Sequence, residues 1–100
     1  MYVVIFTAKL KQLDECYYET AAKLKEVAFD QYNCIKFTSC TEGDLEISAS
    51  CWHSLEDVKN WKQHTEHLQA QAKGKQEEWY ESYEVQVTEV LREYQHSNLK

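Results

Sequence analysis

The sequence predicts an α+β domain of the ferredoxin-like kind, with the order β-α-β-β-α-β and a four-stranded antiparallel sheet. Three observations predict it. Four short runs are rich in β-branched and aromatic residues, and the two stretches between them repeat apolar residues at helical spacing. A chain of 100 residues has room for two layers of secondary structure. We therefore expect a single domain over residues 1–100, with residues 96–100 as a frayed polar tail.

Residues 2–10 predict the first strand, which is apolar on both faces. Val3 and Ile5 lie on one face, whereas Val4 and Phe6 lie on the other. Such a strand has to be covered on both sides.

Asp14 predicts the start of the first helix. An apolar stripe follows at the spacing of one helical face, formed by Tyr17, Ala21, Leu24 and Ala28. Asn33, which tolerates a left-handed backbone, predicts the turn that ends this helix.

Residues 34–40 and 45–52 predict a β-hairpin. Both runs alternate apolar and polar residues, and residues 41–44 (Thr-Glu-Gly-Asp) have the composition of a turn.

Ser54 and Asp57 predict the cap of the second helical region, which we expect to bend near His64 and to end at Gly74. A last strand is predicted from about Tyr80 to Tyr94, with a bulge near residues 89–90.

The helices of this arrangement cover one face of the sheet. The doubly apolar first strand, together with Tyr83, Val85 and Val87, leaves a sheet face that needs a second cover. Another copy of the same sheet is the simplest cover, so we expect a homodimer.

Charge and cysteine content exclude several classes of partner and location. The net charge is −6 and no basic stripe is present, so nucleic acid is not an expected partner. The apolar run after Met1 is too short for a signal peptide or a membrane span, so no membrane partner is expected. The four cysteines form no C-x-x-C pair, which favours reduced thiols in a cytoplasmic protein.

Residues 50–62 (SCWHSLEDVKNWK), residues 66–71 (EHLQAQ) and Gly74 resemble the antibiotic biosynthesis monooxygenase family. The closing residues Tyr80, Tyr83, Val87 and 92–94 are similar to the last strand of that family. The resemblance implies a dimeric α/β barrel in which each subunit holds a small pocket between its sheet and its helices.

Two tryptophans are candidate pocket residues. The resemblance implies that Trp61 lies at the wall of the pocket, where an indole offers a flat apolar face and an N–H donor. The alternative is that Trp61 fills the core beneath its helix. Trp52, at a strand end, is expected to pack in the core, and contact with a ligand is its alternative role.

His64 and His67 are the candidate catalytic bases, because a histidine titrates near neutral pH. They stand three apart on the second helix, and His67 precedes Gln71 by four. Each of these histidines has three possible roles: an exposed or helix-capping residue, a pocket residue, or a metal ligand. No third residue stands at the spacing of a metal ligand, so no metal is expected.

The resemblance also allows haem degradation to be considered position by position. Haem-degrading members use an asparagine on the first strand, a tryptophan on the second helix and a histidine that ligates iron. Trp61 matches, but Thr7 and Gln71 stand at the other two positions and neither ligates iron well. Haem degradation is therefore not expected, although Thr7 and Gln71 stay candidate pocket residues.

The sequence carries no dinucleotide fingerprint, phosphate loop or Ser–His–Asp signature, so no cofactor is expected. The resemblance implies cofactor-independent oxygenation of a small aromatic, phenolic or quinol-like compound. A histidine would then act as the base, and Trp61 N–H as the donor to the developing oxyanion. The rival hypothesis is a non-catalytic protein that binds a small apolar ligand; it needs only an apolar lining.

Overall fold

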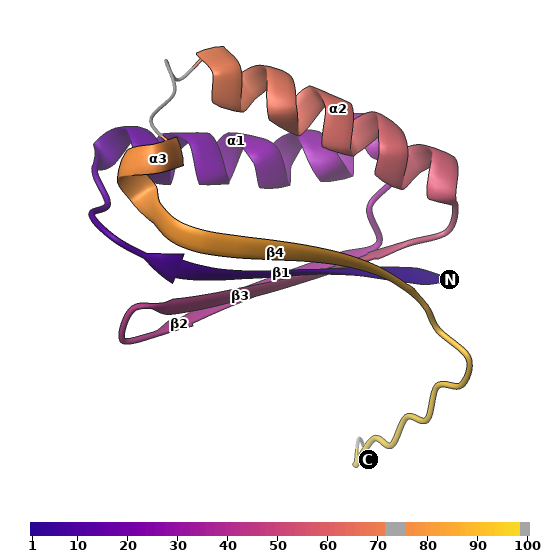
Figure 1. Cartoon of the computed structure of the whole chain (residues 1–100). Coiled ribbons are helices and arrows are strands. Elements are labelled where there is room, and N and C mark those ends of the chain that lie inside the picture. The colour runs from indigo at the N-terminus through magenta and orange to yellow at the C-terminus, as the bar shows by residue number, and fades with distance from the viewer. Residues whose placement is uncertain (72–75, 99–100) are drawn as a thin grey trace.

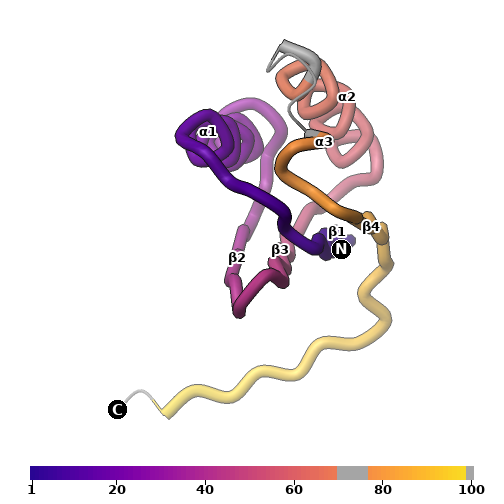
Figure 2. The backbone as a smooth tube through the Cα atoms, turned by 60° about the vertical axis from the view of Figure 1, so that its left-hand side comes forward, coloured from indigo at the N-terminus to yellow at the C-terminus, as the bar shows by residue number. Residues whose placement is uncertain are grey.

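The computed structural model describes residues 1–71 and 76–98; the side chains of residues 70, 71 and 76 lie outside this description. The elements are β1 (Tyr2–Leu10), α1 (Glu15–Tyr32), β2 (Lys36–Glu42), β3 (Leu45–Trp52), α2 (Leu55–Gln71), α3 (Gln76–Trp79) and β4 (Tyr80–Glu89). The strands form an antiparallel sheet in the order β2-β3-β1-β4. α1 and α2 lie side by side over one face of it (Figures 1 and 2). This confirms the predicted fold class.

The predicted helix caps are confirmed. Asp14 Oδ1 accepts a hydrogen bond of 2.9 Å from the backbone N–H of Tyr17, and Ser54 Oγ accepts one of 3.1 Å from Asp57. Asn33 ends α1 in the left-handed conformation, with φ of 61°. Short polar side chains at these positions therefore fix where both long helices begin and where the first ends.

The strand register defines two faces of the sheet. The inner face, toward the helices, carries Val4, Phe6 and Ala8 of β1, Glu46, Ser48 and Ser50 of β3, and Tyr83, Val85 and Val87 of β4. The outer face carries Val3, Ile5 and Thr7 of β1 and Leu45, Ile47, Ala49 and Cys51 of β3. Both helices lie on the inner side, so no helix of the described residues covers the apolar residues of the outer face (Figure 1).

The core lies between the inner face and the two long helices. Trp52 is fully buried and lies among four other buried residues, Val4, Ala28, Cys34 and Val58. The indole N–H of Trp52 donates a hydrogen bond of 2.9 Å to Ser50 Oγ, so the polar atom of this buried ring has a partner.

A second buried group lies where α3 meets the start of α1. Trp79 is 1% exposed, its ring centroid is 5.4 Å from that of Tyr17, and its indole N–H donates to Asp14 Oδ1 at 3.0 Å. One carboxylate therefore caps α1 and anchors α3.

Four details of the structure differ from the predictions. β4 ends at Glu89 and not at Tyr94, because its partner strand β1 begins at Tyr2, opposite Glu89. The irregularity in the pairing lies at residues 9–10, and not at residues 89–90. α2 is a continuous helix through His64. Tyr83, Val85 and Val87 lie on the inner face, so they do not contribute to the uncovered outer face.

The predicted helix end at Gly74 lies outside the described residues. Residues 90–98 leave the sheet and run along the side opposite the helices (Figures 1 and 2), with Leu91 and Tyr94 almost fully exposed. Among residues 1–71 and 76–98, no helix is long and apolar enough to cross a membrane.

Candidate functional site

A cavity that we name the main cavity lies between the inner face of the sheet and the two long helices, and has a volume of about 340 Å³. Small-molecule sites span roughly 300–1,000 Å³, so this cavity suits a small ligand. Its lining is largely apolar. The sheet contributes Val4, Phe6, Phe37, Ser39, Glu46, Ser48, Ser50, Tyr80, Tyr83, Val85 and Val87, and the helices contribute Ala21, Ala22, Leu24, Lys25, Val58, Trp61, Lys62, Thr65, Glu66 and Gln69.

The cavity explains the exposure of the predicted stripe on α1. Tyr17 and Ala28, at the two ends of the stripe, are buried, whereas Ala21 and Leu24 are partly exposed because they line the cavity. The stripe therefore divides between packing in the core and forming a wall.

Trp61 lies at the cavity wall, partly buried against the core. Its ring centroid is 5.0 Å from that of Trp52 and 6.0 Å from that of Phe37. Its indole N–H donates a hydrogen bond of 3.1 Å to the backbone carbonyl of Leu24. Trp61 therefore offers a ligand its ring face, while its N–H joins α2 to α1.

Two other sequence candidates lie away from this cavity. Trp52 is fully buried in the core and is not among the lining residues. Thr7 is paired with Ile47 on the outer face of the sheet, on the side away from the helices. The structure therefore does not bring Thr7 together with Trp61.

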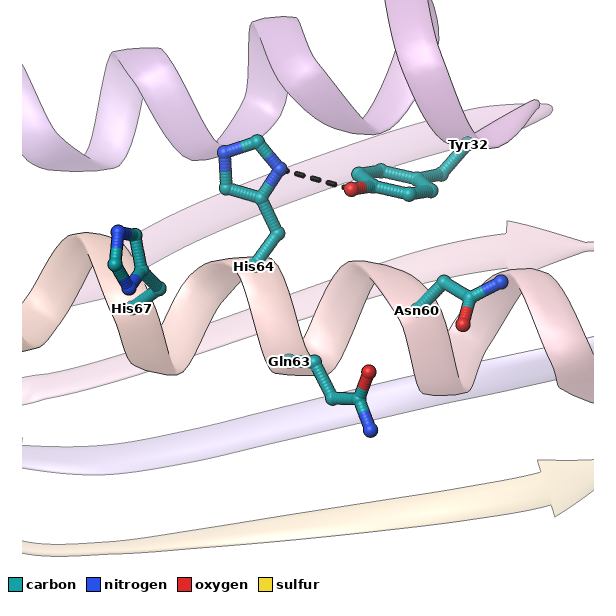
Figure 3. Close-up of a pocket in the computed structure, with 5 residues that line it drawn as sticks. All are labelled: Tyr32, Asn60, Gln63, His64 and His67. Carbon is teal, nitrogen blue, oxygen red and sulfur yellow. Dashed lines mark hydrogen bonds between the residues drawn. The ribbon is translucent and has the colours of Figure 1, made fainter.

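His64 and His67 line a second, shallow pocket together with Tyr32, Asn60 and Gln63. His64 Nδ1 lies 2.9 Å from the hydroxyl of Tyr32 (Figure 3), at the end of α1. This pocket shares no lining residue with the main cavity. The helix phase explains the separation: Val58, Trp61 and Thr65 share the face of α2 that lines the cavity, and the two histidines lie on another face of the same helix.

The side chain of Gln71, also a candidate pocket residue, lies outside the described residues. Within residues 1–71 and 76–98, no group of three or more His, Cys, Asp or Glu side chains is placed to hold a metal ion.

Tyr17, Glu46 and Tyr80 form an acid–tyrosine cluster that was not among the predicted site residues. Glu46 and Tyr80 line the cavity, and Tyr17 lies behind them, where its hydroxyl donates a hydrogen bond to Glu46 Oε2. The ring centroids of Tyr17 and Tyr80 are 6.1 Å apart. Glu46 is therefore a carboxylate held in place at the cavity surface.

A signal for Glu46 was present in the sequence. Glu46 and Trp52 stand six apart on a strand, so they share a face. A tryptophan on a strand face indicates that this face is the covered one, and Glu46 then points toward the helices.

The cluster also shifts the ionisation of both tyrosines. Burial, and then the nearby Glu46 carboxylate, raise the pKa of Tyr80 to about 12. Burial, and then the hydrogen bond to Glu46, raise the pKa of Tyr17 well above its ordinary value. Both hydroxyls therefore stay protonated donors at neutral pH.

These shifts predict a loss of stability at high pH. Tyrosines of the unfolded chain lose their protons near pH ~10, whereas Tyr80 of the folded chain keeps its proton up to about pH 12. The free energy of unfolding is therefore highest below the unfolded pKa and falls as the pH rises toward the folded pKa. Urea unfolding at several pH values between about 9 and 11 measures this fall. It should be smaller in Tyr80→Phe, and equal falls in both proteins would contradict the assignment.

No protein-family model matches the chain. The uncharacterized protein YqjZ of Bacillus subtilis (strain 168) is 39% identical over 93 residues, which cover 92% of this chain and 81% of that protein.

Solved structures share the fold at much lower identity. A candidate antibiotic biosynthesis monooxygenase from Nitrosomonas europaea is 15% identical with a TM-score of 0.68, over 92% of this chain and 100% of that one. SnoaB, a cofactor-independent oxygenase from Streptomyces nogalater, is 9% identical with a TM-score of 0.65, over 92% of this chain and 94% of that one. The chain thus has the fold of these oxygenase-like proteins and belongs to the family of Bacillus subtilis YqjZ.

Proposed function

We propose that this chain is a cofactor-independent monooxygenase of the antibiotic biosynthesis type, acting on a small aromatic, phenolic or quinol-like compound. The observation that carries the proposal is the cavity of about 340 Å³ between sheet and helices. Its walls are aromatic and aliphatic, and it holds the Glu46 carboxylate beside Tyr80. The fold shared with SnoaB, described as a cofactor-independent oxygenase, supports the same reading.

The chemistry requires a bound, electron-rich aromatic diol and dioxygen. In the overall reaction, one oxygen atom of dioxygen becomes a new carbonyl oxygen of the ring. The other oxygen atom leaves as water with the two hydrogens that the diol loses. In this reaction the protein orients the ring, excludes water and accepts the proton of the reacting hydroxyl.

A homodimer forms part of this proposal. The outer face carries Val3, Ile5 and Ile47, and residues 90–98 run along the same side of the sheet with Leu91 and Tyr94 exposed. A second copy covers both. We also infer a cytoplasmic location, which the four free cysteines support. The assignment of residues 1–100 to a single domain stays a prediction.

Oxygen uptake with dihydroxynaphthalene tests the proposed reaction. We expect uptake above the rate without protein and formation of juglone, and isotopically labelled dioxygen should place one labelled atom in the juglone and one in water. Ala21→Phe, which places a ring in the cavity, should abolish the uptake while leaving the protein folded. Absence of uptake by the wild-type protein would contradict the proposal for this substrate class.

The same assay decides the role of the two histidines, which stays a prediction. His64→Ala and His67→Ala alter the shallow pocket and leave the lining of the main cavity intact. Loss of uptake in these variants would place the base at the histidines, whereas retained uptake would place it in the cavity.

A non-catalytic ligand-binding protein is the second candidate function. The separation of both histidines from the cavity favours this second function. Without a histidine, the titratable side chains that line the cavity are carboxylates, lysines and tyrosines, and a binding site can use these without catalysis. Binding of aromatic compounds without oxygen uptake would support this alternative.

A further inference from the structure

Glu46 is positioned by three elements at one part of the cavity. Its register on β3, opposite Ala8 of β1, directs the side chain to the inner face. Tyr17 of α1 donates to its Oε2, and Trp79 packs edge-on against the Tyr17 ring. The carboxylate is partly buried and is fixed from behind the cavity wall, which is how a preorganised binding group is built.

The second oxygen of this carboxylate is available to a ligand. An ionised carboxylate accepts hydrogen bonds at both oxygens, and Tyr17 uses one of them. Among the described residues, none donates to the other oxygen, Oε1. Glu46 lines the cavity, so a ligand hydroxyl there meets an acceptor.

Tyr80 supplies a donor beside this acceptor. Tyr80 lines the same cavity as Glu46, and its ring centroid lies 6.1 Å from that of Tyr17, the residue that donates to Glu46. The Tyr80 ring lies 5.6 Å from that of Phe6 and 5.7 Å from that of Tyr83, centroid to centroid. A flat ligand placed against these rings therefore finds one acceptor and one donor at its edge.

We propose that Glu46 and Tyr80 form a recognition site for a hydroxyl group of a planar aromatic ligand. The ligand O–H donates to Glu46 Oε1, and the ligand oxygen accepts from the Tyr80 O–H. The site selects neutral phenols and naphthols, and it disfavours ligands that carry a carboxylate or phosphate at this position, because the Glu46 charge repels them. The inference rests on the proposed function in one respect, that the cavity takes an aromatic ligand.

Two probes of nearly the same shape test this proposal: naphthol, and methoxynaphthalene, which cannot donate. We expect the wild-type protein to bind naphthol at least about tenfold more tightly, as befits a hydrogen bond to a charged group. In Glu46→Gln, Tyr17 takes the amide oxygen and the NH₂ group faces the cavity, so the preference should fall below about twofold.

Tyr80→Phe removes the donor and is the second test variant. It should weaken the binding of both probes, since each has an ether or hydroxyl oxygen that accepts from Tyr80. Tyr18→Phe is the matched control: it removes the hydroxyl of a tyrosine that does not line the cavity and should leave both affinities unchanged. Titration calorimetry measures the affinities, and thermal unfolding verifies that each variant is folded.

Each outcome bears on the proposal. A preference for naphthol that survives in folded Glu46→Gln overturns it, and so does equal or absent binding of both probes to the wild-type protein. The binding assay requires no turnover. A preference for naphthol that depends on Glu46, in a protein without oxygen uptake, supports this inference and contradicts the monooxygenase proposal. Oxygen uptake that is unaffected by Glu46→Gln supports the monooxygenase proposal and contradicts this inference.

Discussion

We expect light scattering at micromolar concentration to give about twice the mass of one chain. The physical reason is the outer face of the sheet, where Ile5 of β1 lies beside Ala49 of β3, and Thr7 beside Ile47, with no helix over them. Ile47 is 40% exposed and Leu45 42% exposed. A contiguous apolar surface of this kind on a small domain marks an interface.

Ile47→Asp tests this expectation, because it places a charge in the centre of the outer face. Burying an unpaired carboxylate costs several kcal/mol, roughly, which is enough to dissociate a micromolar dimer. Leu55→Asp is the control: Leu55 begins α2, on the other side of the sheet, and is 52% exposed, so this variant should stay dimeric. A wild-type protein that scatters as a single chain would refute the dimer.

The largest loss of stability is expected for Trp52→Ala. Trp52 is 0% exposed, contacts the ring of Trp61 and shares the core with Val4, Ala28, Cys34 and Val58. Truncation of a buried tryptophan costs about 3–5 kcal/mol through lost burial and the cavity left behind. For a domain of this size the melting temperature should fall by more than about 10 °C, measured by circular dichroism.

Leu55→Ala is the matched control, because it also truncates a large apolar side chain, one that is 52% exposed and lies away from the proposed dimer face. We expect a change within about 0.5 kcal/mol in the folding of a single chain. A melting temperature for Trp52→Ala close to that of the wild-type protein would show that Trp52 does not hold the core together.

Most of the fold was predictable from local signals. Asp14, Asn33 and Ser54 act on the backbone next to them, so their roles as caps follow from residue type alone. The end of β4 was not predictable in this way. Tyr94 continues a run of residues that favour strands, but the pairing of β4 with β1 ends where Tyr2 lies opposite Glu89, and beyond it the carbonyl of Met1 accepts from the N–H of Val90.

The site was predictable only in part. Trp61 lies at the cavity wall, because helical spacing places it on the same side as Val58, and its contact with a ligand stays a prediction. His64 and His67 were predicted as catalytic bases from their residue type. Residue type does not indicate the direction in which a side chain points, so it could not predict that both rings lie outside the main cavity. Glu46 depends on which face of β3 the helices cover, and Trp52 on the same face of β3 is the one local signal for it.

The position of β1 in the middle of the sheet has a consequence for synthesis of the protein. β1 pairs with β3 through Tyr2 and Trp52, and with β4 through Tyr2 and Glu89, so its two neighbours leave the ribosome long after it does. Until residues 80–89 have emerged, one edge of an apolar strand stays open to pairing with other chains. Completion of the sheet therefore waits for the last strand, and a nascent chain that stops before Tyr80 is the aggregation-prone form of this protein.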